Sequence, residues 1–287
     1  MLSALQSHSR QLDFYRHVSA NGVLMKESAE IAIIGGSGLY DQDLLENPRE
    51  TKVHTPYGRT SEMIILGKYA GREIAFLSRH GRGHQIPAHN VNYRANIWAL
   101  RQLGVKRILS SNACGSLSEK YKPGDIVVLD QFIDRTKSRH SSFYESGQVC
   151  HISVADPFCP ELAKLFVQEA KKLGISVHDK GTYVCIEGPR FSTRAESRLF
   201  GQWGADVVGM TVVPECVLAR EAEICYGSIA LVTDYDVWAE KPVNLEEILR
   251  VAKSNVDKAK RLFGAIIPKI PEKASCECWS ALKNSLL

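Results

Sequence analysis

The sequence predicts a single α/β domain in which a central, mixed but mostly parallel β-sheet is flanked by helices. From Ile31 onward, short β-branched runs alternate with segments of helical periodicity. That alternation is typical of a largely parallel sheet covered by helices. With 287 residues, 44% of them hydrophobic and 24% charged, the chain can also bury a large core without disulfides or metals.

Short apolar segments along the chain are predicted as strands. The first, Ile31–Ile34, ends at Gly35-Gly36, since glycine is disfavoured in strands. Met63–Leu66 and Glu73–Leu77 flank Ala70-Gly71-Arg72 and predict a hairpin. The remaining predicted strands are Arg107–Ser111, Ile126–Leu129, Gly181–Ile186, Val207–Met210 and Tyr226–Val232.

Helical periodicity fills the stretches between these strands. Pro160 opens a helix to about Leu173, because proline suits a first helical turn, where no amide partner is lost. The last helix is predicted to begin at Asn244, with Glu247 three residues on as in a capping box. Its apolar face is Leu245, Ile248, Leu249, Ala252, Val256, Ala259 and Phe263. The other predicted helices are Val91–Leu103, Thr193–Phe200 and Glu215–Glu223.

Three parts are expected along the chain: a loose N-terminal extension (1–28), the α/β domain (29–270) and a C-terminal tail (271–287). The net charge is +4, from 36 Lys+Arg against 32 Asp+Glu, with no basic block. We therefore expect no nucleic-acid partner. No apolar run is long enough to cross a bilayer, so we expect no membrane partner either.

Eight cysteines are spread along the chain, far below the density of a disulfide scaffold. A reducing, cytoplasmic location is therefore expected. The tail carries one tight pair, Cys276-Glu-Cys278. Reduced thiols are the default interpretation; a local bridge, or a link to Cys216 or Cys225, is the alternative.

The segment Ile33-Ile34-Gly35-Gly36-Ser37-Gly38-Leu39 follows a predicted strand. Its glycines would let backbone amides approach an anion closely. It lacks the third glycine of G-x-G-x-x-G, and no acidic residue closes a strand about 20 residues later, which counts against a dinucleotide-dependent dehydrogenase. Taken alone, the segment is either a phosphate-binding loop or a plain strand-ending turn.

Basic and imidazole side chains gather in residues 78–89. Three histidines, His80, His84 and His89, suggest zinc. However, Arg79 and Arg82 would repel a divalent cation, and the segment contains no Cys or carboxylate. Arginine offers a planar fork of donors to an oxyanion. We expect an anion site here and no metal, with a structural loop as the alternative.

Further candidates also follow predicted strands, where ligands of open α/β sheets bind. Residues 110–116 are small and are expected to end a strand, leaving room for a ligand or forming a simple turn. In the loop 187–194, Phe191 either stacks on a base or packs in the core. Asp234 and Asp236 lie two residues apart at a strand end, where repulsion would raise one pKa, as a general acid needs. Solvated loop acids are the alternative.

Taken in order, these segments resemble the methylthioadenosine phosphorylase family, within the trimeric purine nucleoside phosphorylases. The resemblance runs from Ile31 to Ile267. It implies a nucleoside phosphorylase-like fold, a homotrimer (a hexamer in some relatives), a small nucleoside substrate, inorganic phosphate as co-substrate, and no metal or organic cofactor. The motifs that carry it are IAIIGGSGLYD, TPYGRTSE, RHGRGH, NYRANIWAL, ACGSL, YKPGDIVVLDQFIDRT, ADPFCP, IEGPRFSTRAES, GMTVVPE and TDYDVW.

The activity implied by the resemblance is phosphorolysis of 5'-methylthioadenosine to adenine and 5-methylthioribose 1-phosphate. Asp234 and His80 would be catalytic. Met210 would face the ribose, Phe191 the purine ring, and Asp234, Tyr235 and Asp236 the adenine. The phosphate-binding residues carried over by motif are Ser37, Arg79, His80, Asn112, Ala113 and Thr211.

Specificity is expected to depend on a few of these positions. Relatives that cleave 6-oxopurine nucleosides place Glu where Ser192 stands and Asn where Asp234 stands, so this chain favours adenine. Leu245 offers apolar surface to a 5'-methylthio group. Ser37 and Asn112 stand where many family members carry Thr, which leaves strictness toward the 5' group open. A 6-oxopurine nucleoside phosphorylase and a non-catalytic nucleotide-binding protein of this fold are the alternatives.

Overall fold

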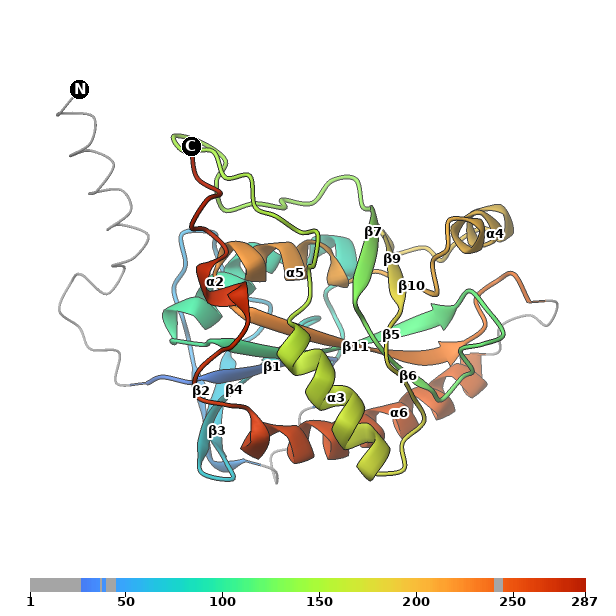
Figure 1. The fold of residues 1–287 in the computed structure, drawn as a ribbon, viewed down its shortest axis with the longest axis horizontal. Helices are drawn as coiled ribbons and strands as arrows, with labels where there is room; N and C mark the ends of the chain where they lie inside the picture. The colour runs from blue at the N-terminus through green and yellow to red at the C-terminus, as the bar shows by residue number, and fades with distance from the viewer. Residues whose placement is uncertain (1–26, 37, 40–44, 240–244) are drawn as a thin grey trace.

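The computed structural model describes residues 27–36, 38–39, 45–239 and 245–287 (Figure 1). The helices are α2 (Tyr93–Gln102), α3 (Pro160–Lys172), α4 (Arg194–Gln202), α5 (Val212–Glu221) and α6 (Leu245–Ile266). The strands are β1 (Ile31–Gly35), β2 (Glu46–Thr51), β3 (Ile64–Tyr69), β4 (Arg72–Ser78), β5 (Arg107–Ser116), β6 (Ile126–Val128), β7 (Gln131–Arg135), β8 (Val177–His178), β9 (Thr182–Ile186), β10 (Val207–Gly209) and β11 (Cys225–Asp234).

One mixed sheet holds all of these strands, in the order β2-β3-β4-β1-β5-β10-β9-β7, with β11, β6 and β8 branching from β5. Six of the strand pairs are parallel and four antiparallel. Helices α2 and α5 cover one side, and α3 and α6 the other (Figure 1). Each side has its own apolar core. The predicted single α/β domain with a mixed, mostly parallel sheet is confirmed.

Strand β5 is longer than expected. Residues 112–116 continue the strand, so the strand end predicted at Ser111 and the alternative of a simple turn are both wrong. The backbone stays in the ladder because partners are available along its whole length: β11 pairs with it as far as Gly115, and β10 pairs with Gly115 and Ser116. The backbone hydrogen bonds to these partners stabilise the strand, although small polar residues have a weak intrinsic preference for strands.

Three short strands were not expected from the sequence. β2 reads Glu-Asn-Pro-Arg-Glu-Thr and is exposed along most of its length at the sheet edge. Its polar composition has no strand-like alternation. β7 is half-exposed and β8 has only two residues, so neither shows a clear pattern either.

The last helix buries part of the predicted face, since Ala259 and Phe263 are buried as expected, but the buried face is shifted toward its start. Its expected start, Asn244, lies outside the described residues. Leu249 is 61% exposed, whereas Val251 and Asn255 are buried. Asn255 tolerates burial because its amide donates to the carbonyl of Val232 over 2.8 Å. In the part of the chain that the structure describes, no helix combines the length and apolarity of a membrane span.

The close packing of α3 on β11 can be tested at Gly227. Gly227 lies where a Cβ atom would sit 2.6 Å from Leu162 Cβ and 2.8 Å from Phe166 Cε2. We expect Gly227→Ala to lower the free energy of unfolding by about 1–3 kcal/mol through overpacking. Urea denaturation measures the change.

The matched control is Gly201→Ala on α4, where the nearest atom to the added Cβ would be 3.6 Å away. This variant should be neutral or gain up to about 1 kcal/mol from helix propensity. Equal losses in both variants would contradict the packing argument.

Candidate active site

A buried ion pair lies where β4 ends. Arg79 follows that strand and meets Glu215 of α5 through two bonds, Nε to Oε2 and Nη2 to Oε1, each 2.7 Å long. Arg79 also donates to Ser110 Oγ (2.7 Å) and to the Ser111 carbonyl (3.0 Å). Tyr226 of β11 donates to the Glu215 carboxylate over 2.7 Å. Four elements thus meet at one pair of charges.

The Arg79 guanidinium remains charged although its side chain is only 2% exposed. Burial alone would lower the pKa of Arg79, but the charge and hydrogen bonds of Glu215 raise it above its ordinary value. Most of the five N–H donors of the guanidinium are occupied by these protein acceptors. Arg79 is therefore a fixed positive charge at the carboxyl end of β4. Its hydrogen bonds to the protein were not expected from the sequence.

Beside this pair, a short hydrogen-bond chain joins three buried side chains. Thr211, which precedes α5, donates to Asn112 Oδ1 over 2.7 Å, and Asn112 Nδ2 donates to Ser228 Oγ over 2.7 Å. Their neighbour Ala113 is exposed, although residues on both sides of it are buried. The sheet is therefore open at Ala113, next to fixed polar groups. Four predicted phosphate residues, Arg79, Asn112, Ala113 and Thr211, come together here.

His80, next to Arg79, is held as a neutral imidazole. Its Nδ1 lies 2.8 Å from the Ile86 carbonyl, so Nδ1 carries the proton and Nε2 is an acceptor. Burial, then the charge of Arg79, lower the pKa of His80 to about 4. His84 stacks on its ring at 4.2 Å between centroids. Among the described residues, one group of side chains could hold a metal ion, and it contains no histidine: Cys159, Cys225, Cys276 and Cys278.

The two aspartates predicted to act together lie at the end of β11 and just beyond it. A bulge between Val232 and Asp234 sets Asp234 opposite Gly115 of β5. A Cβ on Gly115 would lie 3.1 Å from Asp236 Cβ and 3.4 Å from Asp234 Oδ2. The missing side chain of Gly115 is therefore what lets both aspartates approach β5.

Burial dominates the acid–base properties of these aspartates. It raises the pKa of Asp234 above its ordinary value, while a bond from Thr233 lowers it and the Asp236 charge raises it further. Burial also raises the pKa of Asp236. The expected rise is present, but its main cause is desolvation and mutual repulsion is secondary. The interpretation as solvated loop acids is wrong, because Asp236 is buried and Asp234 half-buried.

The loop before α4 packs against the segment that follows β10. Gly188 packs on Met210, where a Cβ would lie 2.6 Å from the sulfur. Phe191 is 73% exposed, so the alternative of a core role is wrong. Ser192 is buried, and its hydroxyl has no hydrogen-bond partner within the described ranges. Tyr235 stacks edge-on against Trp238, with 5.8 Å between ring centroids.

Not every predicted site residue can be placed. Ser37 and the side chain of Leu245 lie outside the described residues. In the other direction, sequence reasoning assigned no role to Glu215, Tyr226 or Gly115. Glu215 stood in a quoted motif, GMTVVPE, yet nothing local in that motif marks it as the partner of an arginine 136 positions away.

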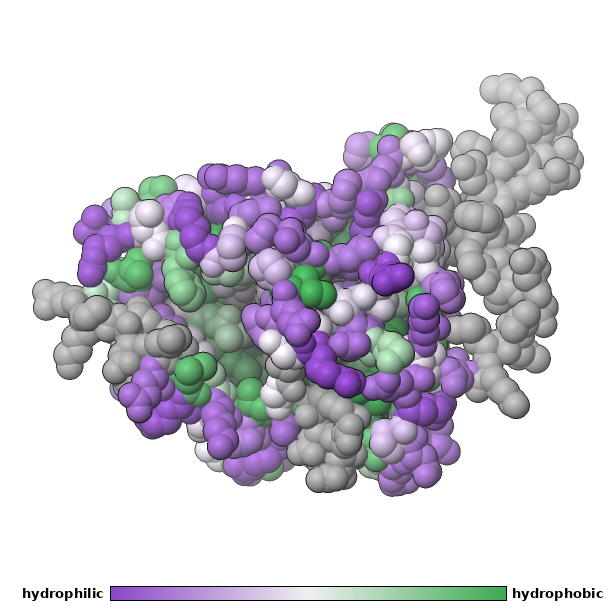
Figure 2. Space-filling view, turned by 180° about the vertical axis from the view of Figure 1, so that it is seen from behind, coloured by the Kyte–Doolittle hydropathy of each residue, from purple (hydrophilic) through white to green (hydrophobic). Residues whose placement is uncertain are grey.

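The face turned away in Figure 1 carries a hollow with apolar side chains at its floor, surrounded by hydrophilic residues (Figure 2). Such a hollow, with a few fixed polar groups, is typical of small-molecule sites.

The sequence is similar to known proteins over most of the chain. A model of the phosphorylase superfamily matches residues 30–268. The S-methyl-5'-thioadenosine phosphorylase of Thermofilum pendens is 59% identical over 261 residues, covering 91% of this chain and 100% of its own. The chain belongs to the S-methyl-5'-thioadenosine phosphorylase family.

Solved structures of this family have the same fold. A methylthioadenosine phosphorylase from an antarctic soil metagenomic library superposes with a TM-score of 0.88 at 47% identity, covering 91% of this chain and 93% of its own. That of Schistosoma mansoni in complex with adenine has a TM-score of 0.83 at 38% identity, with 89% and 96% covered. The resemblance inferred from the motifs is confirmed.

The contribution of the buried ion pair to stability can be tested by substitution. We expect Glu215→Gln to lower the free energy of unfolding by about 3–5 kcal/mol, because it leaves the Arg79 charge buried without its counter-charge. The double variant Arg79→Met/Glu215→Leu should recover much of that loss. Urea denaturation compares them.

Glu50→Gln is the control for this experiment. It breaks an exposed pair with Arg82 of the same 2.7 Å length and should cost at most about 1 kcal/mol. A loss in Glu215→Gln no larger than in this control would show that the buried pair contributes little.

Proposed function

We propose that this protein catalyses phosphorolysis of 5'-methylthioadenosine, giving adenine and 5-methylthioribose 1-phosphate. One observation carries the proposal: β5 holds Asn112 of the polar cluster and Gly115, against which Asp234 and Asp236 pack. Three residues of strand span about 10 Å. A nucleoside with phosphate beneath its ribose can bridge that distance, with its base at the aspartates.

In this proposal phosphate binds over Asn112, Ala113 and Thr211. Arg79 supplies a fixed positive charge that attracts the phosphate dianion. Neutral His80 accepts a hydrogen bond at Nε2 from a protonated phosphate oxygen. Ser37, predicted from its motif, completes the set. Polar groups held in place in this way need no reorganisation when charge develops.

The reaction then proceeds by cleavage of the glycosidic bond. As the bond between C1' and the base nitrogen lengthens, the ribose gains oxocarbenium character and the bound phosphate stabilises it. A phosphate oxygen forms the new bond to C1', and the electron pair of the broken bond moves into the purine. Protonated Asp234 donates its proton to the imidazole nitrogen N7, so adenine leaves as a neutral molecule.

Other residues determine the substrate specificity. Asp236 accepts from the 6-amino group, supported by its buried Oδ2, which has no hydrogen-bond partner among the described residues. Tyr235 and Phe191 contact the base, and Met210 faces the ribose. Ser192 leaves the purine edge without the carboxylate of the 6-oxopurine enzymes, and Leu245 contacts the methylthio group.

For the intact protein we propose a cytoplasmic homotrimer, or a hexamer built from two trimers, that needs no metal or organic cofactor for this reaction. Exposed apolar side chains support association: Phe191, Leu199 and Trp203, all in or beside α4, are between 42% and 73% exposed. Surfaces of this kind are typical of protein contacts. Exclusion of water by a neighbouring subunit would also raise the pKa of the aspartates further.

The deciding experiment incubates 5'-methylthioadenosine with the protein, with and without phosphate, and follows free adenine by chromatography. Adenine formed only with phosphate supports phosphorolysis. Adenine formed equally without phosphate indicates hydrolysis and overturns the proposed phosphate site. If neither tube contains adenine, phosphate-dependent cleavage of inosine would identify a 6-oxopurine enzyme, and its absence would favour a non-catalytic protein.

Asp234→Asn gives a third prediction. Since the amide cannot transfer a proton, we expect kcat for 5'-methylthioadenosine to fall by about 100-fold to 10,000-fold. The KM for phosphate should change little, because phosphate lies at the other end of the site. The exposed Asp156→Asn is the control and should retain wild-type kcat. Wild-type turnover in Asp234→Asn would exclude the acid role.

The pH dependence of kcat gives a fourth prediction. Burial raises the pKa of Asp234, so its reactive protonated form persists to higher pH than in a free aspartate. That form is lost as pH rises through this pKa, so the wild-type rate should fall on the alkaline side. Asp234→Asn should lack this limb while keeping its low residual rate. An identical alkaline limb in both proteins would assign it to another group.

A further inference from the structure

A buried arginine on the connection between β7 and α3 has no role in the reaction described above. The Arg139 side chain is only 2% exposed, although the residues on either side of it, Ser138 and His140, are exposed. The guanidinium therefore points from a surface segment into the protein. A buried cation is costly unless its donors are satisfied, so its partners show which parts of the protein it holds.

The guanidinium donates to backbone carbonyls from three segments of the chain. Nη2 donates to the Glu187 carbonyl over 2.6 Å and to the Ile186 carbonyl over 3.3 Å, where β9 passes into the loop before α4. Nη1 donates to the Met210 carbonyl over 2.7 Å, just after β10, and to the Val213 carbonyl over 2.5 Å, at the start of α5. One rigid, planar group therefore fixes three backbone segments relative to one another.

Two of these segments carry residues proposed to bind the nucleoside. Phe191 lies in the loop that begins at Glu187, and Met210 is proposed to face the ribose. Gly188 of the same loop packs on Met210, so a shift of one segment disturbs the other. The third segment begins α5, two residues before Glu215. The arginine therefore connects the nucleoside side of the proposed site to the helix that carries the buried ion pair.

The connection is anchored on both sides of this arginine. Before it, the Lys137 amide donates to Glu187 Oε2 over 2.8 Å. After it, Ser142 Oγ and the Phe143 amide each donate to the carboxylate of Glu221 over 2.8 Å, and Glu221 is buried. Because both flanking stretches are held, the guanidinium enters the protein from a defined position, as a group that supports a binding site must.

We propose that Arg139 is a positioning residue for the nucleoside subsite. Its bonds to the Glu187, Met210 and Val213 carbonyls fix the base loop and the ribose-facing residue relative to α5. It acts through the backbone of residues that contact the nucleoside, and the inference rests on the proposed function. Displacement of a positioned group by about 1 Å can lower a rate by about 100-fold, so loss of these bonds should alter the kinetics of the nucleoside.

Kinetics of Arg139→Met test this role. We expect kcat/KM for 5'-methylthioadenosine to fall by about 10-fold to 100-fold, mainly through a higher KM. The KM for phosphate should change little, because Thr211 and Asn112 keep the hydrogen bond between them. A general loss of stability would not separate the two substrates in this way.

Arg72→Met is the matched control. Arg72 also donates to a backbone carbonyl, that of Ile270 over 2.9 Å, and pairs with Glu30 over 2.7 Å, with 19% of its side chain exposed. It begins β4, at the opposite end of that strand from Arg79. This variant should lose bonds of a similar kind and retain both KM values.

Amide hydrogen exchange gives a readout that does not require catalysis. In Arg139→Met, peptides covering residues 186–192 and 208–214 should exchange faster than in the wild type, while the rest of the sheet keeps its protection. Arg72→Met should leave both peptides unchanged. If the wild-type protein forms no adenine from 5'-methylthioadenosine and phosphate, the proposed function fails, and exchange alone then decides whether Arg139 holds these segments.

Arg139→Lys provides a second variant in case Arg139→Met does not fold. Lysine keeps the charge but replaces the planar fork of donors with a single nitrogen, so we expect a smaller loss of kcat/KM for the nucleoside. Wild-type kcat/KM in Arg139→Met, or in Arg139→Lys where only that variant folds, would overturn the proposal. Equal losses in Arg139→Met and Arg72→Met, or faster exchange across the whole chain, would also overturn it.

Discussion

The buried contact between Arg79 and Glu215 is the interaction on which the site depends. It joins the end of β4 to α5, and Ser110 of β5 and Tyr226 of β11 bond to the same two groups. An ion pair removed from water is stable only when its hydrogen bonds are well satisfied. These elements therefore cannot shift separately without breaking bonds to a buried charge. The resulting rigidity is what a preorganised anion site requires.

Strand β5 fixes the distance between Asn112 and Gly115. It pairs with β11 from Arg107 to Gly115, with β1 from Arg107 to Ser110, and with β10 at Gly115 and Ser116. Pairing with β11 continues from Asn112 to Gly115, so the spacing between these two residues follows from strand geometry and needs no loop to hold it. In the proposed reaction, the phosphate and base subsites are therefore placed by one continuous strand.

The sequence predicted the parts of the fold with strong periodicity and little of what depends on distant partners. The α/β class, the hairpin at Ala70-Gly71 and the helix from Pro160 could be predicted because their signals are local. Residues 112–116 could not, because their strand character comes from β10 and β11. Glu215 was unassigned for the same reason, as its partner is distant in sequence. A raised pKa for one of the two aspartates was predicted, but its main cause was not, since burial cannot be judged from two acids two residues apart.

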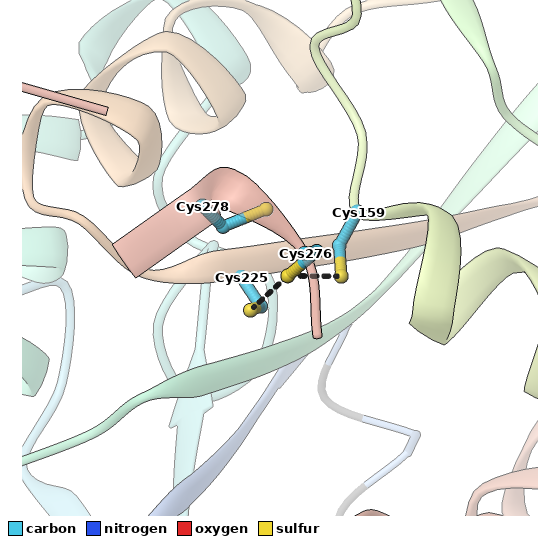
Figure 3. A group of neighbouring side chains, drawn as sticks. All are labelled: Cys159, Cys225, Cys276 and Cys278. Carbon is cyan, nitrogen blue, oxygen red and sulfur yellow. Dashed lines mark hydrogen bonds between the residues drawn. The ribbon is translucent and has the colours of Figure 1, made fainter. Parts of the chain in front are cut away.

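The position of Asp234 shows how far such a site depends on remote packing. Strand β11 runs from Cys225 (Figure 3) to Asp234, and it is buried almost throughout. A slip of one residue would turn every side chain of the strand to the opposite face. The bulge after Val232 uses this property locally, because it sets Asp234 in place of Thr233 against Gly115. Contacts that hold the start of β11 therefore also fix which side chain lies against Gly115 at its end, where the proposed reaction places the base.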